Sequence, residues 1–297
     1  MDVAVFGFDQ TIDGFEASLR TAAEQGFTSY WTPQIFGMDA LTGIAVAARN
    51  VPGIRVGTSV IPTYPRHPMM LAQQALTTQS AIDGRLILGI GLSHKPVVEG
   101  MWGISFDKPI RHMSDYLSIL MPLLRDRRVS FGGESVTGRG EITPPPADAP
   151  PVVVAALGPQ MLRLTGKMAD GTITWMTGPE TIRTLTAPTI NEAAEEAGRP
   201  APQIVMGLPV CVTDDVDAAR ARADRDYAIY GQLPSYRAML DLEGAATPAD
   251  VAIIGTAAEV CERVRNLASC GVTTFAASSF GNPEEAAATR AAMVSLL

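Results

Sequence analysis

The sequence predicts a (β/α)8 TIM barrel with a small hairpin insertion and an extra helical segment after the seventh strand, as a single domain over residues 1–297. Eight short apolar segments alternate strictly with helical segments, and parallel strands need such crossovers. A chain of 297 residues suits eight such units. The turn after the first strand, Phe6-Gly-Phe-Asp-Gln10, lacks the Gly-x-Gly-x-x-Gly pattern of the doubly wound dinucleotide-binding sheet, which is the alternative fold.

Four of the units fill the first part of the chain. The third strand carries alternating β-branched residues, and the fourth is a continuous apolar run, which is typical of a strand buried on both faces. We expect strands at Val3–Phe8, Thr28–Trp31, Arg55–Val60 and Arg85–Ile90. We expect the matching helices at about Thr11–Gln25, Asp39–Ala48, Pro68–Ala81 and Ile110–Leu124.

The remaining four units follow the glycine-containing stretch Val129–Thr143, which predicts the inserted hairpin, and a proline-rich connector. We place the connector inside the domain because strands and helices alternate again immediately after it. We expect strands at Val152–Ala155, Thr172–Trp175, Ile204–Val212 and Gly271–Ala277. Helices are expected at about Pro159–Met168, Pro179–Ala197, Ala257–Ser269 and Pro283–Leu297, with the extra helical segment at Asp215–Asp241.

Composition and charge exclude several classes of protein. A net charge of −8 argues against a nucleic-acid partner, which would require a basic patch. No apolar run reaches the roughly 18 residues that cross a bilayer, and the segment Met1–Gly7 has no signal-peptide features. The cysteines Cys211, Cys261 and Cys270 have neither metal-ligand nor redox spacing, so we expect a cytoplasmic protein.

The predicted strand ends, where a barrel places its functional groups, carry mostly small, uncharged or aromatic residues. The chain has three histidines, no His-x-His pair and no paired carboxylates at these ends, so we expect no metal site. It has no Gly-x-Ser-x-Gly elbow for a serine nucleophile. Such a rim favours a large planar organic cofactor that brings its own chemistry.

Three stretches supply candidate contacts to such a cofactor: the loop after the third strand, the stretch Ala155–Met161, and the end of the fourth strand at His94. The third strand opens into a loop fixed by Pro62, Pro65 and Pro68, from which we expect Arg66 and His67 to contact the cofactor. The stretch Ala155–Met161 leaves a strand and begins a helix, whose free N–H groups suit an anion.

His94, at the end of the fourth strand, is the candidate proton donor. A loop histidine bonded to backbone is its alternative interpretation. For Ala155–Met161 the alternative is a tightly packed turn.

Together these motifs resemble the luciferase-like monooxygenases, and most of all their branch of coenzyme F420-dependent oxidoreductases. The resemblance rests on Arg55–Val60 with the Pro65-Arg-His-Pro68 loop, Leu88-Gly-Ile-Gly-Leu-Ser-His94, Ala155-Ala-Leu-Gly-Pro-Gln160 and Ala169-Asp-Gly171. It covers nearly the whole chain in the same order.

The resemblance implies that a deazaflavin ring lies in the barrel mouth and transfers a hydride at C5 to or from a small organic substrate. It implies a cis peptide at Ser59–Val60 and contacts from Leu92, Ser93 and His94 to the ring or ribityl chain. Ala156, Leu157, Gly158 and Pro159 would hold the ribityl and phosphate groups. A homodimer is expected because many relatives form one.

One departure concerns the second strand. Related dehydrogenases often carry an acid–histidine pair where this chain has Pro33-Gln34. Gln34 forms hydrogen bonds but is no general acid, so we place it beside the ring as a catalytic-site residue. Either His94 or His67 replaces the acid, or the reaction needs no acid from the protein. Three alternatives stay open: an FMN-dependent monooxygenase, a non-catalytic flavin-binding protein, and a barrel enzyme without a redox cofactor. The substrate pocket is expected to involve Met101–Lys108 and Tyr227–Thr247.

Overall fold

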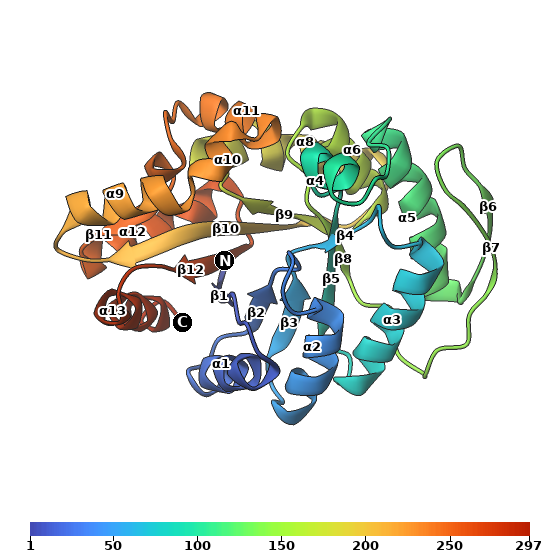
Figure 1. Cartoon of the computed structure of the whole chain (residues 1–297), viewed down its shortest axis with the longest axis horizontal. Coiled ribbons are helices and arrows are strands. Elements are labelled where there is room, and N and C mark those ends of the chain that lie inside the picture. The colour runs from blue at the N-terminus through green and yellow to red at the C-terminus, as the bar shows by residue number, and fades with distance from the viewer.

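The computed structural model describes all residues from 1 to 297 and contains a closed parallel barrel (Figure 1). Neighbouring strands pair in the order β1-β2-β3-β5-β8-β9-β10-β12, and β12 pairs again with β1 to close the ring. These strands are β1 Asp2–Phe6, β2 Ser29–Thr32, β3 Arg55–Thr58, β5 Leu86–Gly91, β8 Val152–Val154, β9 Gly171–Trp175, β10 Gln203–Val212 and β12 Thr274–Ser279. The predicted eight-stranded barrel is confirmed.

Helices surround the barrel and alternate with its strands. They are α1 Ile12–Glu24, α2 Ala40–Ala47, α3 Pro68–Ala81, α5 Pro109–Asp126, α6 Pro159–Met168, α7 Pro179–Thr181 with α8 Ala187–Glu196, α12 Ala257–Asn266 and α13 Pro283–Val294. Side-chain caps determine where several helices begin, because they bond the N–H groups that the first turn of a helix leaves unpaired. Thr256 with Glu259 at α12 and Asn282 with Glu285 at α13 form capping boxes. No helix is both long enough and apolar enough to span a membrane.

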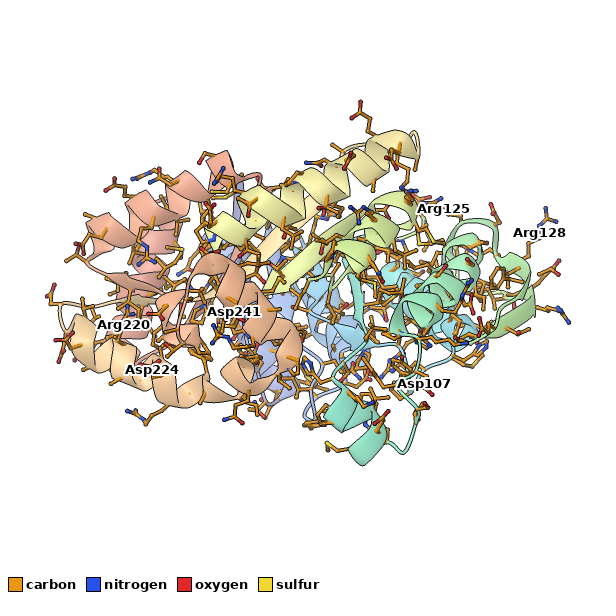
Figure 2. The ribbon with its side chains drawn as sticks, turned by 90° about the horizontal axis from the view of Figure 1, so that it is seen from above. Asp107, Arg125, Arg128, Arg220, Asp224 and Asp241 are labelled. Atoms are coloured by element: carbon orange, nitrogen blue, oxygen red, sulfur yellow. The ribbon has the colours of Figure 1, made fainter.

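The two expected insertions are present. The hairpin consists of β6 Arg128–Gly132 and β7 Thr137–Glu141, paired antiparallel. The helical segment consists of α9 Val216–Asp226, α10 Ala228–Gln232 and α11 Pro234–Glu243. The hairpin and α9 lie at opposite ends of the long axis (Figure 1). Seen from above, Arg128 of β6 and Asp224 of α9 point outward at the surface (Figure 2).

Some element boundaries differ from those the sequence predicts. The first strand ends at Phe6 and the third at Thr58, where the chain turns, and β4 Ile61–Pro62 then pairs with β5. The predicted helix Pro179–Ala197 is divided by a π-helical turn at Ile182–Thr186. Two elements were not predicted: α4 Lys95–Gly100, and β11 Ile253–Gly255, which pairs with the end of β10 outside the ring.

Apolar side chains also fill the inside of the barrel. The interior cluster contains Phe6, Trp31, Ile87, Val153, Ile173 and Val205, with Val60 and Trp175 packed on it. Trp31 fits only because its neighbour is a glycine: a Cβ on Gly57 would lie 2.3 Å from the Trp31 ring. The barrel is therefore closed by side chains below and open to a ligand only at its carboxyl end.

Candidate active site

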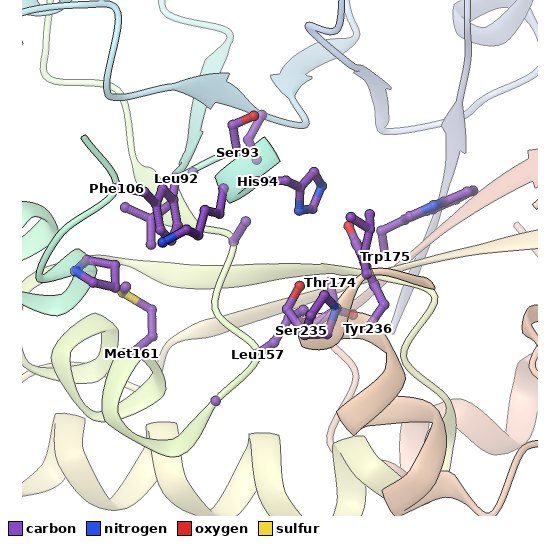
Figure 3. Close-up of a pocket in the computed structure, with 18 of the residues that line it drawn as sticks. Leu92, Ser93, His94, Phe106, Leu157, Met161, Thr174, Trp175, Ser235 and Tyr236 are labelled. Atoms are coloured by element: carbon purple, nitrogen blue, oxygen red, sulfur yellow. The ribbon is translucent and has the colours of Figure 1, made fainter. Parts of the chain in front are cut away.

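A cavity of about 1330 Å³ lies at the carboxyl ends of the barrel strands (Figure 3). Its walls come from the ends of β5, β8 and β9, from the turn between β3 and β4, and from α4, α6 and α11. Eight of the residues expected at the site line it: Ser59, Val60, Leu92, Ser93, His94, Leu157, Gly158 and Pro159. The barrel thus brings three separate sequence motifs to one place.

The wall made by Ser59 and Val60 depends on Thr58. The Thr58 hydroxyl donates to the carbonyl of Gly89 and accepts from its N–H, each at 2.8 Å, so it replaces backbone pairing where β3 leaves β5. The peptide bond Ser59–Val60 is cis, as the resemblance implied. Val60 then packs on β5 at two glycines, because a Cβ on Gly91 would lie 2.6 Å from Val60 Cγ2.

The second wall is the end of β5. Ser93 has φ 61°, in the left-handed region that non-glycine residues rarely adopt. This turn ends the strand and leads into α4, whose N-cap is His94. Burial lowers the pKa of the His94 imidazole below 6.5, so the ring is neutral at pH 7 and carries one N–H donor and one acceptor.

The third wall is the start of α6. Its first backbone hydrogen bond runs from Leu162 N–H to the Gly158 carbonyl, so the N–H groups of Gln160 and Met161 have no partner in the helix. Gly158 has open space where a Cβ would stand. These donors and the helix dipole suit a phosphate. Ala156 differs from its neighbours Leu157, Gly158 and Pro159, because it is fully buried in the core and does not line the cavity.

The end of β9 adds Thr174 and Trp175, of which Trp175 was expected to line a pocket from its place at a strand end. Trp175 stacks on Phe6, with ring centroids 5.0 Å apart, and forms part of the floor. The Thr174 hydroxyl is buried without a protein partner. Buried polar groups are normally hydrogen-bonded, so this hydroxyl is a candidate for bonding a ligand.

The helical insertion also reaches the cavity. Leu233, Pro234, Ser235 and Tyr236, at the start of α11, line it, as does Phe106 from the loop before α5. Both segments were expected to shape the pocket. The individual residues could not be identified from the sequence, because they become neighbours of His94 only where the folded chain brings these segments to the barrel mouth.

Besides Ala156, three predicted site residues lie outside this lining, and their polar groups have other partners. Gln34 accepts from Ala40 N–H and donates to Asp39, at the start of α2. Arg66 forms an ion pair with Asp39 and a hydrogen bond with Gln74. His67 is the N-cap of α3, and its Nε2 lies 3.0 Å from the Thr137 carbonyl. All three therefore stabilise loops around the mouth.

Comparison with known proteins gives a consistent family. A family model described as luciferase-like monooxygenase matches residues 7–274. A putative coenzyme F420-dependent oxidoreductase of Mycobacterium tuberculosis is 32% identical over 72% of this chain and 67% of its own length. A 5,10-methylenetetrahydromethanopterin reductase of Methanolobus tindarius is 27% identical over 69% of this chain and 62% of its own. These matches leave about a third of each relative outside the alignment.

Among solved structures, an F420-dependent secondary alcohol dehydrogenase in complex with an F420–acetone adduct superposes with a TM-score of 0.84 and 19% identity. The superposition covers 100% of this chain and 99% of that one. At this identity the likeness concerns the fold.

Proposed function

The chain belongs to the luciferase-like monooxygenase family, and on that premise we propose that it is a coenzyme F420-dependent oxidoreductase acting on a small organic substrate. When bound, the deazaflavin donates or accepts a hydride at C5. The protein contributes binding, orientation and exclusion of water. The observation that supports this most is the single large, mostly uncharged cavity that joins Ser59–Val60, the end of β5 and the start of α6.

The residues present fit such a cofactor. The cavity, of about 1330 Å³ and lined by Val60, has the volume for a tricyclic ring, and Gly158 leaves room for a chain to approach the backbone. Leu92 and Ser93 would contact the ring or ribityl group. The free N–H groups of α6 would bind the phosphate side.

His94 would hold or donate a proton at the polar edge of the ring, in place of the acid–histidine pair of related dehydrogenases. Its side chain caps no backbone group and lines the cavity, so it is free for this role. Its pKa, lowered by burial, keeps the imidazole neutral at pH 7. His94 therefore acts as a hydrogen-bonding group and gives or receives a proton through solvent exchange.

Fluorescence titration of the purified protein with coenzyme F420 and, separately, with FMN tests the proposal. We expect binding of the deazaflavin and anaerobic oxidation of its reduced form by an organic acceptor. Oxygen consumption with reduced FMN instead would support the FMN-dependent monooxygenase. Tight binding without turnover of any acceptor would support a non-catalytic protein, and binding of neither cofactor would overturn all three.

We also propose a homodimer. Two apolar side chains on the neighbouring helices α2 and α3, Val46 and Met70, are 47% and 57% exposed. Apolar surface of this kind is a candidate for burial between subunits. Light scattering at micromolar concentration tests this: a mass of one chain, 31.4 kDa, would contradict it.

A further inference from the structure

Resting on the proposed function, we infer that the end of the cavity between His94, Trp175 and Tyr236 binds an uncharged carbonyl compound, whose oxygen accepts a hydrogen bond from the Tyr236 hydroxyl. In the reductive direction a reduced deazaflavin would supply a hydride to the carbonyl carbon. The π electron pair would move to the oxygen, which would gain a proton from solvent by way of His94, and the deazaflavin would lose two electrons. Tyr236 orients the carbonyl group and is not consumed.

The three side chains come from three different elements and lie around one space (Figure 3). The ring of Tyr236 lies 5.6 Å from the ring of His94, tilted by 50°. Tyr230 packs behind this wall, edge-on to Tyr236 at 5.0 Å and to Trp175 at 6.0 Å, and does not line the cavity. Packing by Tyr230 restricts the rotamers of both rings, so the Tyr236 hydroxyl has a defined position.

Charge argues for a neutral ligand at this end. The cavity lining contains only one lysine and one carboxylate, Lys95 and Glu99, which pair with each other at 3.4 Å on α4. The lining contributed by α11 and β9 has no ionic side chain. Arg237 follows Tyr236, but it bonds Asp241 and the carbonyl of Ala246. A carboxylate or phosphate bound here would lose water without gaining a counter-ion.

Polar chemistry argues for a carbonyl oxygen. The hydroxyl of Tyr236 makes no hydrogen bond to another protein group. Burial, with a smaller contribution from Tyr230, raises the pKa of Tyr236 above 10, so the hydroxyl stays protonated and is available as a donor. The aromatic faces around it suit an apolar body, so the pocket matches a molecule with one hydrogen-bond acceptor on an apolar frame.

Matched pairs of ketones test the inference: acetophenone against 4-acetylbenzoate, and cyclohexanone against 4-oxocyclohexanecarboxylate. Fluorescence first establishes that the protein binds coenzyme F420. Calorimetry then measures binding of each ketone to the oxidised holoenzyme, where no turnover occurs, and anaerobic oxidation of the reduced cofactor measures kcat and KM. We expect the neutral member of each pair to bind and to react with kcat/KM at least about tenfold above its carboxylate analogue.

The variant Tyr236→Phe keeps the ring and removes the donor. We expect it to weaken ketone binding and raise KM by about tenfold, with the Kd for the cofactor and the thermal melting temperature unchanged. Tyr116→Phe, which removes a buried hydroxyl that has no partner and lies outside the cavity lining, is the matched control and should change KM less than twofold. Equal reaction of the charged analogues, no binding of either neutral ketone to cofactor-loaded protein, or a Tyr236→Phe variant that behaves as wild type would each overturn the inference while leaving the cofactor assignment intact. Failure to bind coenzyme F420 would overturn both.

Discussion

The carboxylate of Glu243 joins the last turn of α11 to Thr181 of α7, accepting from its N–H at 2.7 Å and from its hydroxyl at 2.8 Å. It also accepts from Glu180 N–H at 3.1 Å. Its Cδ lies so close to Gly178 that a Cβ there would stand 2.2 Å away. This contact fixes the helix that carries Tyr236 to the segment that follows Trp175.

We therefore expect Glu243→Ala to loosen α11. It leaves the backbone N–H groups of Glu180 and Thr181 without their acceptor, and the Thr181 hydroxyl keeps only the carbonyl of Met239, which costs about 1–3 kcal/mol of unfolding free energy. KM for the substrate should rise, because Tyr236 loses its fixed position, while the Kd for the cofactor changes little. Urea unfolding and steady-state kinetics measure both effects. Glu262→Ala, at an exposed site on α12, is the control; equal behaviour of the two variants would contradict the role of Glu243.

Gly91→Ala should impair cofactor binding through Val60. The added methyl group would meet Val60 Cγ2 at 2.6 Å and Ala155 Cβ at 3.2 Å, so the wall beside the ring must move. We expect the Kd for the cofactor to rise about tenfold. Gly100→Ala adds the same group on the cavity lining where nothing lies within 4 Å, and should change Kd less than twofold. Val60→Ala in the Gly91→Ala background should restore binding, and no rescue would argue against this steric path.

Stability should fall on acidification because of His112. Its ring is buried, stacks on Tyr64 at 3.9 Å and lies 3.0 Å from the Thr63 hydroxyl. Burial lowers the pKa of His112 from 6.5 to about 4, against a smaller opposite effect of Asp115.

Between about pH 6.5 and pH 4 the unfolded chain therefore binds a proton that the folded chain does not. The contribution to stability is complete above pH 6.5 and decreases as the pH falls, by about 2 kcal/mol at pH 5. In His112→Phe the difference in unfolding free energy between pH 7 and pH 5 should shrink by that amount. Chemical denaturation at both pH values measures it, and an unchanged difference would show that other groups dominate.

Gln34 provides a test of a site assignment. Since its amide bonds Ala40 N–H and Asp39, we expect Gln34→Ala to lower stability by about 1 kcal/mol and to leave kcat within twofold of wild type. A hundredfold loss of kcat would instead support the predicted role of Gln34 as a catalytic-site residue.

His94→Asn addresses proton handling directly. Asparagine preserves a polar group on the lining but carries no exchangeable imidazole proton. We expect kcat to fall by about a hundredfold with cofactor Kd within threefold of wild type. Retention of full activity would mean that solvent alone supplies the proton.

Local patterns were sufficient for the barrel. The apolar run Arg85–Ile90 and the alternating β-branched residues of Arg55–Val60 are properties of short segments. They can therefore be recognised without knowing which strands will be neighbours. The three-residue strand Ile253–Gly255 exists only through pairing with the end of β10, and α4 depends on the left-handed turn at Ser93. Neither element can therefore be predicted from the residues of its own short segment.

The same distinction applies to the site. Residues at strand ends, such as Ser59, His94 and Gly158, line the cavity because the barrel itself directs them there. Arg66 and Gln34 follow strands too, yet both turn to Asp39, which accepts hydrogen bonds from each of them. Tyr236 is distant in sequence from every motif, and only tertiary packing places it opposite His94.

The placement of tryptophans gives the molecule an internal optical reporter. Of Trp31, Trp102 and Trp175, only Trp175 lines the cavity, while Trp31 is sealed in the barrel interior. A ligand that absorbs in the near ultraviolet and settles beside Trp175 should quench its indole emission by resonance energy transfer. Occupancy of the mouth is therefore readable in the unlabelled chain, and the quenching should be smaller in Trp175→Phe.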